Sequence, residues 1–278
     1  MVSTTNNTEI SDQELIAINQ VLMTKYGYDF SGYEPSSIKR RLSRIIHKFE
    51  LDGILDLWRK LMSDYNFMLD FKDEISVGLT EMFRNTDLWI YLKNEYMPLL
   101  SHKDNIKIWH SGCSTGEEVW SMSILTHEVG IFHKCKAIST DLSNKFIEIS
   151  KSATYDDHAM QVYNKNYLEY NPYGTLYQYF TPLQNNTYTI KNSLKTYSEL
   201  YQHNLVYDPM PHTFDIIFCR NVMIYFNDSL KMKVLDSLHK SLSHDGIFII
   251  GYFDNMPQEY GQYFEYYAPG YKIYKKIS

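Results

Sequence analysis

Two acidic side chains follow a glycine-rich turn at residues 112–116, and they raise the first question about chemistry. The segment IWHSGCSTGEE, residues 108–118, has the pattern of a buried strand, a tight turn and the start of a helix. Backbone N–H groups at a helix N-terminus attract negative charge, so turns of this kind usually bind phosphate. Glu117 and Glu118 carry the wrong charge for that ligand.

Three kinds of nucleotide ligand compete for this turn. A Walker-type loop ends in Gly-Lys-Ser/Thr, whereas this turn ends in Gly116-Glu117 and lacks the lysine that contacts phosphate. A dinucleotide turn, as in a nicotinamide-dependent oxidoreductase, needs G-x-G-x-x-G and would place its pyrophosphate beside the two acids. A cationic adenosyl ligand without phosphate fits better. S-Adenosylmethionine, which has an ammonium and a sulfonium group, has that chemistry.

A second acid stands where such a ligand needs one. Asp141 ends the next apolar run, about 25 residues after the turn, the spacing at which Rossmann-like sheets place an acid that binds ribose hydroxyls. The alternatives are structural. Asp141 also suits the cap of a helix that starts near Leu142, and Glu117 also suits a helix dipole. The combination of strand, turn and two acids in order favours the cofactor site.

The run FDIIFCRNVMIYF, residues 214–226, contains a further strand whose end could contribute to the ligand-binding edge of the sheet. Its strand ends in Arg220 and Asn221, and ligands of such sheets bind beyond the carboxyl ends of the strands. Asn221 is therefore a candidate to face the cofactor and Tyr225 a candidate to face the reacting methyl. Taken alone, Tyr225 is better explained as a packed tyrosine with a satisfied hydroxyl.

About the first 100 residues are predicted to be helical. Ser11 and Glu14 form a capping box, and apolar residues at helical spacing predict further helices over 36–51, 55–62, 67–77 and 86–100. From residue 106 the pattern changes to short apolar runs at 106–109, 136–139, 214–219 and 246–250, separated by helical stretches such as 118–128 and 228–242. This alternation predicts an α/β fold with a doubly wound, Rossmann-like sheet. A tyrosine-rich segment at about 167–203, with an Asn185-Asn186 turn, predicts a small antiparallel β-subdomain.

Composition narrows the class of protein. The chain has 278 residues, a formal net charge of −6 and 25 tyrosines. The negative charge disfavours nucleic-acid binding. The cysteines, Cys113, Cys135 and Cys219, lack metal-binding spacing and indicate reduced thiols in the cytoplasm. No export signal or membrane-spanning run is evident, so we expect a cytoplasmic monomer without a metal.

Three motifs together resemble one family. They are GCSTGEE at 112–118 after Ile-Trp, CRNVMIYF at 219–226 and LTEMFR at 79–84, and the sequence resembles the CheR family of bacterial chemotaxis receptor methyltransferases over nearly its whole length. The resemblance implies an all-α N-terminal domain, residues 1–100, and an S-adenosylmethionine-dependent methyltransferase domain, 101–278, with the β-subdomain inserted. It also implies methyl esterification of glutamates on chemoreceptor cytoplasmic helices in chemotaxis adaptation.

The resemblance also implies residue roles. Arg84 and Tyr225 would flank the transferred methyl, and the cofactor would be contacted by Thr80, Arg84, Gly112, Glu117, Asp141, Asn204, Leu205 and Asn221. A basic helix would dock the acidic receptor helix through Lys39, Arg40, Arg41, Arg44 and Lys48, although a solvated helix face explains the same charges. The β-subdomain would bind a receptor C-terminal tail by adding a strand. A glutamate carboxylate is already ionised near neutral pH, so no catalytic base is required.

Two segments depart from the family pattern. Gly78 stands where the family usually has Asn, and Gly251-Tyr252-Phe253-Asp254 replaces Gly-His-Ser-Glu. The family's glycine-bearing loop in the β-subdomain is also replaced, by Asn185-Asn186. These departures leave an alternative from another class: a module that binds S-adenosylmethionine or S-adenosylhomocysteine and interacts with chemoreceptors, with little methyl transfer.

Overall fold

The chain folds into two compact units in the computed structural model, which describes residues 10–76 and 78–277. The first unit comprises residues 10–76 and 225–231, and the second comprises 78–224 and 232–277. The boundary therefore lies before residue 78 and not near 100. Met82, Phe83 and Trp89 are buried in the same apolar core as Ile106 of the sheet, which explains why the segment 78–100 packs with the second unit.

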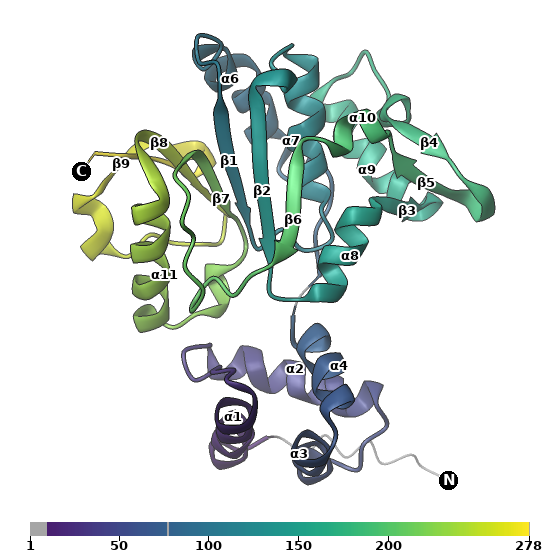
Figure 1. Ribbon diagram of the computed structural model, residues 1–278, viewed down its shortest axis with the longest axis vertical. Helices are drawn as coiled ribbons and strands as arrows, with labels where there is room; N and C mark the ends of the chain where they lie inside the picture. Colours follow the sequence, from purple (N-terminus) through teal and green to yellow (C-terminus); the bar gives the residue numbers. More distant parts are fainter. Residues whose placement is uncertain (1–9, 77, 278) are drawn as a thin grey trace. The chain divides into compact units, whose positions relative to one another are not determined.

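Four helices make up most of the first unit (Figure 1): α1 (Asp12–Tyr26), α2 (Pro35–Lys48), α3 (Ile54–Ser63) and α4 (Tyr65–Ile75). The predicted capping box is confirmed, because Ser11 Oγ accepts the Glu14 N–H and the Glu14 carboxylate accepts the Ser11 N–H. The helix that follows the capping box and those predicted over 36–51, 55–62 and 67–77 are all present, with shifted ends. Val77, the predicted end of the fourth, lies outside the described residues.

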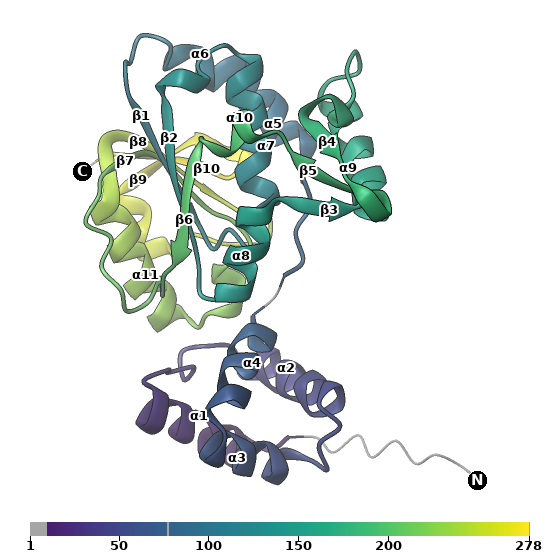
Figure 2. The same cartoon turned by 45° about the vertical axis from the view of Figure 1, so that its right-hand side comes forward.

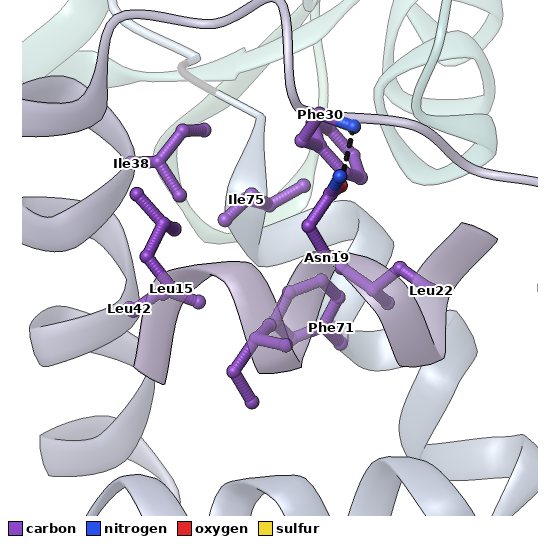
Figure 3. A pocket seen from close by; sticks show the side chains of 9 residues that line it. Leu15, Asn19, Leu22, Phe30, Ile38, Leu42, Phe71 and Ile75 are labelled. Atoms are coloured by element: carbon purple, nitrogen blue, oxygen red, sulfur yellow. Dashed lines mark hydrogen bonds between the residues drawn. The ribbon is translucent and has the colours of Figure 1, made fainter. Parts of the chain in front are cut away.

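A small pocket lies in the core of this helical unit (Figure 3). The side chains that line it are Leu15, Ile18, Asn19, Leu22, Phe30, Ile38, Leu42, Phe71 and Ile75. Its one polar side chain, Asn19, is already engaged, since its oxygen accepts the Phe30 N–H at 2.7 Å and its nitrogen donates to Asp29. The pocket is thus a gap in an apolar core, without free groups for chemistry.

The described part of the second unit is built on a seven-stranded sheet with the order β6-β2-β1-β7-β8-β10-β9. Its strands are β1 (Ile106–Ser111), β2 (Cys135–Asp141), β6 (Ser198–Gln202), β7 (Phe214–Cys219), β8 (Leu242–Ile250), β9 (Phe264–Ala268) and β10 (Ile273–Lys276). The pairs from β6 to β8 are parallel, and β10 pairs antiparallel with both β8 and β9. The predicted doubly wound sheet is confirmed.

Helices cover both faces of this sheet, with α11 on one side and α7 on the other (Figures 1 and 2). The helices are α5 (Thr86–Tyr91), α6 (Met97–Leu99), α7 (Glu117–Glu128), α8 (Asn144–Ser152), α9 (Asp157–Tyr170), α10 (Asn192–Lys195) and α11 (Asp228–Ser241). The helix predicted over 86–100 is interrupted by a π-helical turn, Leu92–Tyr96. Within the described residues, no helix is both long and apolar enough to cross a bilayer.

A separate antiparallel sheet confirms the predicted excursion but differs in extent. Its order is β3 (Thr154–Asp156), β5 (Thr187–Ile190) and β4 (Phe180–Pro182). β3 lies before the predicted range of 167–203, and β6, inside that range, joins the large sheet instead. The Asn185-Asn186 turn is confirmed. Both asparagines have a positive φ, which Asn tolerates better than most residues, so they replace a glycine there.

Candidate active site

The carboxyl ends of four adjacent parallel strands bring the candidate residues together. In the sheet order β6-β2-β1-β7, these ends are followed by Asn204, Asp141, the glycine turn and Asn221 respectively. Such an edge is where α/β sheets bind their ligands. The parallel order therefore gathers residues that are up to about 110 positions apart in the chain.

The glycine turn takes its shape from positive φ angles and close packing. Gly112 has φ +75° and Gly116 has φ +95°. A Cβ on Gly112 would lie 2.5 Å from Val222 Cγ2, and one on Gly116 would lie 2.2 Å from Ser150 Oγ. The turn is also tied to β2, because the Gly112 N–H donates to the Thr140 carbonyl at 2.8 Å. Any side chain at either glycine would strain this turn.

Asp141 connects the turn to the end of β2. One carboxylate oxygen accepts the Ser114 N–H and the other accepts the Ser143 N–H, both at 2.9 Å. These two hydrogen bonds fix the Asp141 carboxylate at the carboxyl end of β2, beside the glycine turn, where the sequence predicts a ribose-binding acid. The helix cap considered as an alternative is provided by Ser143, whose hydroxyl accepts the Phe146 N–H.

Glu117 is the first residue of α7 and is buried, with 3% of its surface exposed. Thr115 Oγ1 donates to one carboxylate oxygen at 2.7 Å and the Tyr163 hydroxyl donates to the other at 2.9 Å. Burial raises the pKa of Glu117 to about 7, although these two hydrogen bonds oppose the shift. No ion pair to Glu117 is found within residues 10–76 and 78–277. A ligand cation would therefore supply the missing partner.

Glu118 points into a different environment and is already neutralised. Arg220 donates to one of its oxygens at 3.2 Å, and His110 Nδ1 lies 3.0 Å from the other. Burial alone would raise the pKa of Glu118, but the His110 hydrogen bond and the Arg220 charge outweigh it and lower the pKa. The pair of acids seen in the sequence thus separates into Glu118, which is paired with Arg220 and His110, and Glu117, which has no cationic partner among the described residues.

Arg220 also fixes the segment that carries Arg84. Its second terminal nitrogen donates to the Arg84 carbonyl at 3.1 Å and to Asn85 Oδ1 at 2.7 Å. Trp89 Nε1 donates to the same carbonyl at 3.0 Å. Phe83 and Asn85, on either side of Arg84, have φ of 54° and 61°, a strained conformation that this packing maintains. The half-buried Arg84 side chain donates to the Leu79 carbonyl.

Asn221 follows β7 in a left-handed conformation, with φ 59°. Its N–H and those of Gly251 and Ile224 all donate to the Asp254 carboxylate at 2.7–2.9 Å. Asp254 is the shortened acid of the Gly251-Tyr252-Phe253-Asp254 departure, and it still holds three backbone groups. Burial raises the pKa of Asp254, although these hydrogen bonds oppose the shift.

The Gly78 departure has a local explanation. A Cβ on Gly78 would lie 2.8 Å from the ring of Phe146 in α8, so a side chain at this position would require the ring to move. Thr80, two residues on, is half-buried. At the other end of the edge, the His203 N–H donates to the Asp141 carbonyl at 2.9 Å, which places Asn204 and Leu205 directly after β6.

Tyr225 belongs to the first unit by its packing. Its carbonyl accepts the Glu34 N–H at 2.9 Å, and the Arg41 guanidinium lies 4.2 Å from the centre of its ring. The expected approach of Tyr225 to Arg84, which lies in the second unit, stays a prediction. Arg41 itself is buried, with 4% of its surface exposed, and donates to the Ile75 carbonyl.

The basic helix α2 therefore differs from the predicted docking face at one position. Arg41 points into the unit, whereas Arg40, Arg44 and Lys48 are exposed. Two of the charges already have partners, because Lys39 pairs with Asp12 at 2.7 Å and Lys48 pairs with Glu74. An amphipathic helix must bury one side, and Arg41 shares that side with Ile38 and Ile45.

The residues present fit S-adenosylmethionine. Glu117 is a buried carboxylate with no cationic partner among the described residues, and the Asp141 carboxylate lies at the end of β2 beside the glycine turn. Ser114 Oγ is buried in the turn and has no hydrogen-bond partner among the described residues, so a polar ligand atom can engage it. A phosphorylated coenzyme would meet the Glu117 charge instead.

Comparison with known proteins agrees with this geometry. The CheR methyltransferase SAM-binding domain matches residues 78–269, and the CheR methyltransferase all-alpha domain matches residues 13–76. The protein is thus an S-adenosylmethionine-dependent methyltransferase by family and fold, and it belongs to the CheR methyltransferase family. The resemblance seen in the motifs is confirmed, as are the fold class and the cofactor.

Similar proteins cover the chain almost end to end. A Pseudomonas putida protein called methyltransferase Cher3 is 30% identical over 96% of this chain and 97% of its own length. A chemotaxis protein methyltransferase of Vibrio parahaemolyticus is 27% identical over 87% of this chain and 89% of its own. One of Borreliella burgdorferi is 26% identical over 88% and 89%.

Three residues that support the site are absent from the sequence-based prediction. Tyr163 and Thr115 hold the Glu117 carboxylate, and Arg220 links Glu118 to the Arg84 segment. Arg220 was identifiable as a polar residue at a strand end. Tyr163 was not, because nothing in a run of tyrosines indicates which one reaches α7.

Proposed function

We propose that this protein transfers a methyl group from S-adenosylmethionine to glutamate side chains of chemoreceptor cytoplasmic helices, forming methyl esters in the cytoplasm. When bound, the cofactor supplies a methyl group on a positively charged sulfur, and an ionised carboxylate accepts it without a base. The names of the Vibrio and Borreliella relatives support the chemotaxis role.

One observation carries the choice of a carboxylate as the acceptor. Arg84 is a half-buried cation on a segment whose backbone is strained on both sides and is held by Arg220 and Trp89. A fixed guanidinium orients a carboxylate by charge and by paired hydrogen bonds. Proximity and orientation of this kind contribute on the order of 7–11 kcal/mol in favourable cases, which suits a reaction that needs no proton transfer.

The remaining roles are those that the family resemblance implies. Glu117 binds the cofactor ammonium, Asp141 its ribose hydroxyls, and Thr80, Gly112, Asn204, Leu205 and Asn221 contact the rest of the cofactor. The role proposed for Tyr225, a contact to the acceptor, is the one that the family resemblance implies. The exposed cations of α2, Arg40 and Arg44, attract the acidic receptor helix and raise the encounter rate.

The proposal includes binding of a receptor tail to the small sheet. β4 lies at the edge of that sheet, beside β5, and an edge strand can pair with an added strand. Pro182 at the end of β4 lacks an N–H, which limits pairing to the residues before it. The protein would act there as a monomer with one tail.

A transfer assay tests the proposal. The purified protein, labelled S-adenosylmethionine and receptor cytoplasmic fragments should yield an alkali-labile methyl ester, and fragments with the acceptor glutamates changed to alanine should not. Arg84→Gln should lower kcat/KM about a hundredfold, the loss expected for a charge-assisted contact to the acceptor, while cofactor affinity changes less.

The same assay separates the alternative. Bound cofactor with no ester from any receptor fragment would eliminate methyl transfer and would favour a cofactor-binding interaction module. Calorimetry with NAD and with S-adenosylhomocysteine distinguishes the oxidoreductase interpretation, since tight binding of NAD alone would contradict the cofactor assignment.

A further inference from the structure

The small sheet and α9 are formed by residues 154–190, called here the inserted segment, which lies between β2 and β6 in the chain. Tyrosines of α9 reach both ends of α7. Tyr163 and Tyr170 are seven residues apart on α9, so they lie on the same face of the helix. The Tyr163 hydroxyl donates to Glu117 at 2.9 Å, and the Tyr170 hydroxyl donates to Glu128 at 2.8 Å. Glu117 is the first residue of α7 and Glu128 the last.

The contact between Tyr163 and Glu117 is enclosed. Tyr163 has 7% of its surface exposed and Glu117 has 3%. The Tyr163 ring packs edge-on against Tyr155 of β3, with 5.5 Å between the ring centres. The Tyr155 hydroxyl in turn donates to the Thr115 carbonyl at 3.1 Å. Two tyrosines of the inserted segment thus support the glycine turn from one side.

We propose that Tyr163 is a positioning residue for cofactor binding: its hydroxyl fixes the orientation of the Glu117 carboxylate and stabilises the negative charge that binds the ammonium group of S-adenosylmethionine. Tyr163 acts through Glu117 and does not itself contact the cofactor. The inserted segment thereby contributes to the cofactor site as well as to the small sheet.

The charge on Glu117 depends on this hydrogen bond because the carboxylate has no cationic partner in the part of the chain that the structure describes. Burial raises the pKa of Glu117 to about 7, and the donors Thr115 and Tyr163 hold it down against a larger rise. The other titratable groups that face Glu117 are Cys113 of the turn, Tyr155 of β3 and Tyr163 of α9. Burial raises the pKa of all three, so they stay neutral at pH 6–8.

Cofactor affinity should therefore follow the ionisation of Glu117. Below its pKa the carboxyl group is neutral and offers the ammonium no opposite charge, so affinity should fall about tenfold from pH 8 to pH 6. Loss of the Tyr163 hydroxyl should raise the Glu117 pKa further. The midpoint of the affinity profile should then move up by about one pH unit.

The chain offers a matched control. Tyr163→Phe and Tyr170→Phe each remove one hydroxyl from a buried ring of α9, and each hydroxyl contacts a glutamate of α7. Affinity for S-adenosylhomocysteine is measured by calorimetry from pH 6 to 8 for both variants of the full chain. Circular dichroism verifies that each variant is folded before binding is compared.

Tyr163→Phe should weaken binding at pH 7 about fivefold to tenfold and shift the midpoint upward, whereas Tyr170→Phe should keep the wild-type profile. In a Glu117→Gln background the profile should be flat, and Tyr163→Phe should have no further effect beyond twofold. A wild-type midpoint in Tyr163→Phe, or an equal loss in both single variants, would overturn the proposal.

The measurement is independent of methyl transfer. S-Adenosylhomocysteine reports the cofactor site alone, so a failure of receptor methylation would leave this test intact. A failure here would leave the acceptor assignment intact.

Discussion

Each end of α7 carries a shielded glutamate, but the pKa values of the two glutamates shift in opposite directions. Glu117 and Glu128 are each shielded from solvent, and each accepts a hydroxyl from a tyrosine of α9. Glu128 also pairs with Lys93 at 2.8 Å and accepts the hydroxyls of Tyr167 and Tyr179. Glu117 has no cation among the described residues.

The pKa values diverge accordingly. Burial would raise both, but Lys93 and the tyrosines outweigh it at Glu128 and lower that pKa. At Glu117 burial dominates and raises the pKa to about 7. A buried carboxylate that pairs with a cation of the protein has a structural role. A buried carboxylate without such a partner can pair with a cationic ligand. The difference supports the proposal that Glu117, and not Glu128, binds the cofactor.

The largest expected effect is on stability. Glu117 has a pKa of about 7 when folded and an ordinary value of 4.5, so the unfolded chain loses this proton first as pH rises. Stability is therefore lost between about pH 4.5 and 7, and the full loss is about 3 kcal/mol above pH 7. Glu117→Gln, which mimics the neutral form, should be more stable than wild type by that amount at pH 7.5.

Urea unfolding at pH 5, 6 and 7.5 checks this sign. The stability difference between Glu117→Gln and wild type should grow with pH and level off near pH 7.5. Glu128 acts in the opposite direction, because its lowered pKa adds stability above its unfolded pKa, and that stability is lost as pH falls through the folded value. If the stability difference between Glu117→Gln and wild type did not change with pH, the raised pKa of Glu117 would be contradicted.

The same substitution should weaken cofactor binding. Glu117→Gln removes the charge opposite the ammonium, and a charge-assisted hydrogen bond contributes about 2 kcal/mol, or roughly thirtyfold in Kd. Calorimetry with S-adenosylhomocysteine at pH 7.5 measures the change. Glu128→Gln serves as the control and should bind within about twofold of wild type. Equal losses in the two variants would mean that both ends of α7 act only through folding.

Glu128→Gln should instead lower stability. The change leaves Lys93, whose side chain is 27% exposed, without its carboxylate. Removing one partner of a fully buried pair costs more, and the partial exposure of Lys93 reduces the expected loss to about 1–2 kcal/mol. Urea unfolding at pH 7.5 gives the value, with Lys93→Gln as the complementary variant. A gain in stability would mean that the ionised Glu128, like Glu117, destabilises the fold.

The edge of the sheet could be predicted from the sequence because it depends on local patterns. Apolar runs gave β1, β2 and β7, and parallel order then placed Asp141, Glu117 and Asn221 at one edge. The last two strands, β9 and β10, were not predicted. Their sequences, FEYYA and IYKK, contain tyrosine, glutamate and lysine in place of a continuous apolar run. β9 lies at the edge of the sheet, where one side of the strand is open to solvent.

The partners of the acids could not be predicted. Glu117 and Glu118 are adjacent and chemically identical, yet successive helical residues point about 100° apart, and only tertiary packing decides which one meets Arg220. Arg41 illustrates the same limit. It stands among exposed cations in the sequence but lies against Tyr225, because its position on α2 faces the interior.

The smallest predicted effect tests whether Glu128 has more hydrogen-bond donors than its stability requires. Tyr179 comes from a 3-10 turn, Leu176–Tyr179, and its hydroxyl is 2.8 Å from Glu128. Tyr179→Phe removes that one donor, but Lys93, Tyr167 and Tyr170 still contact the carboxylate. No buried charge is left without a partner, so the loss should be about 1 kcal/mol or less, as for an ordinary hydrogen bond. Urea unfolding measures it, and cofactor affinity should not change. A loss as large as that of Glu128→Gln would show that Tyr179 organises the cluster, and the two ends of α7 would then resemble each other in depending on a single tyrosine.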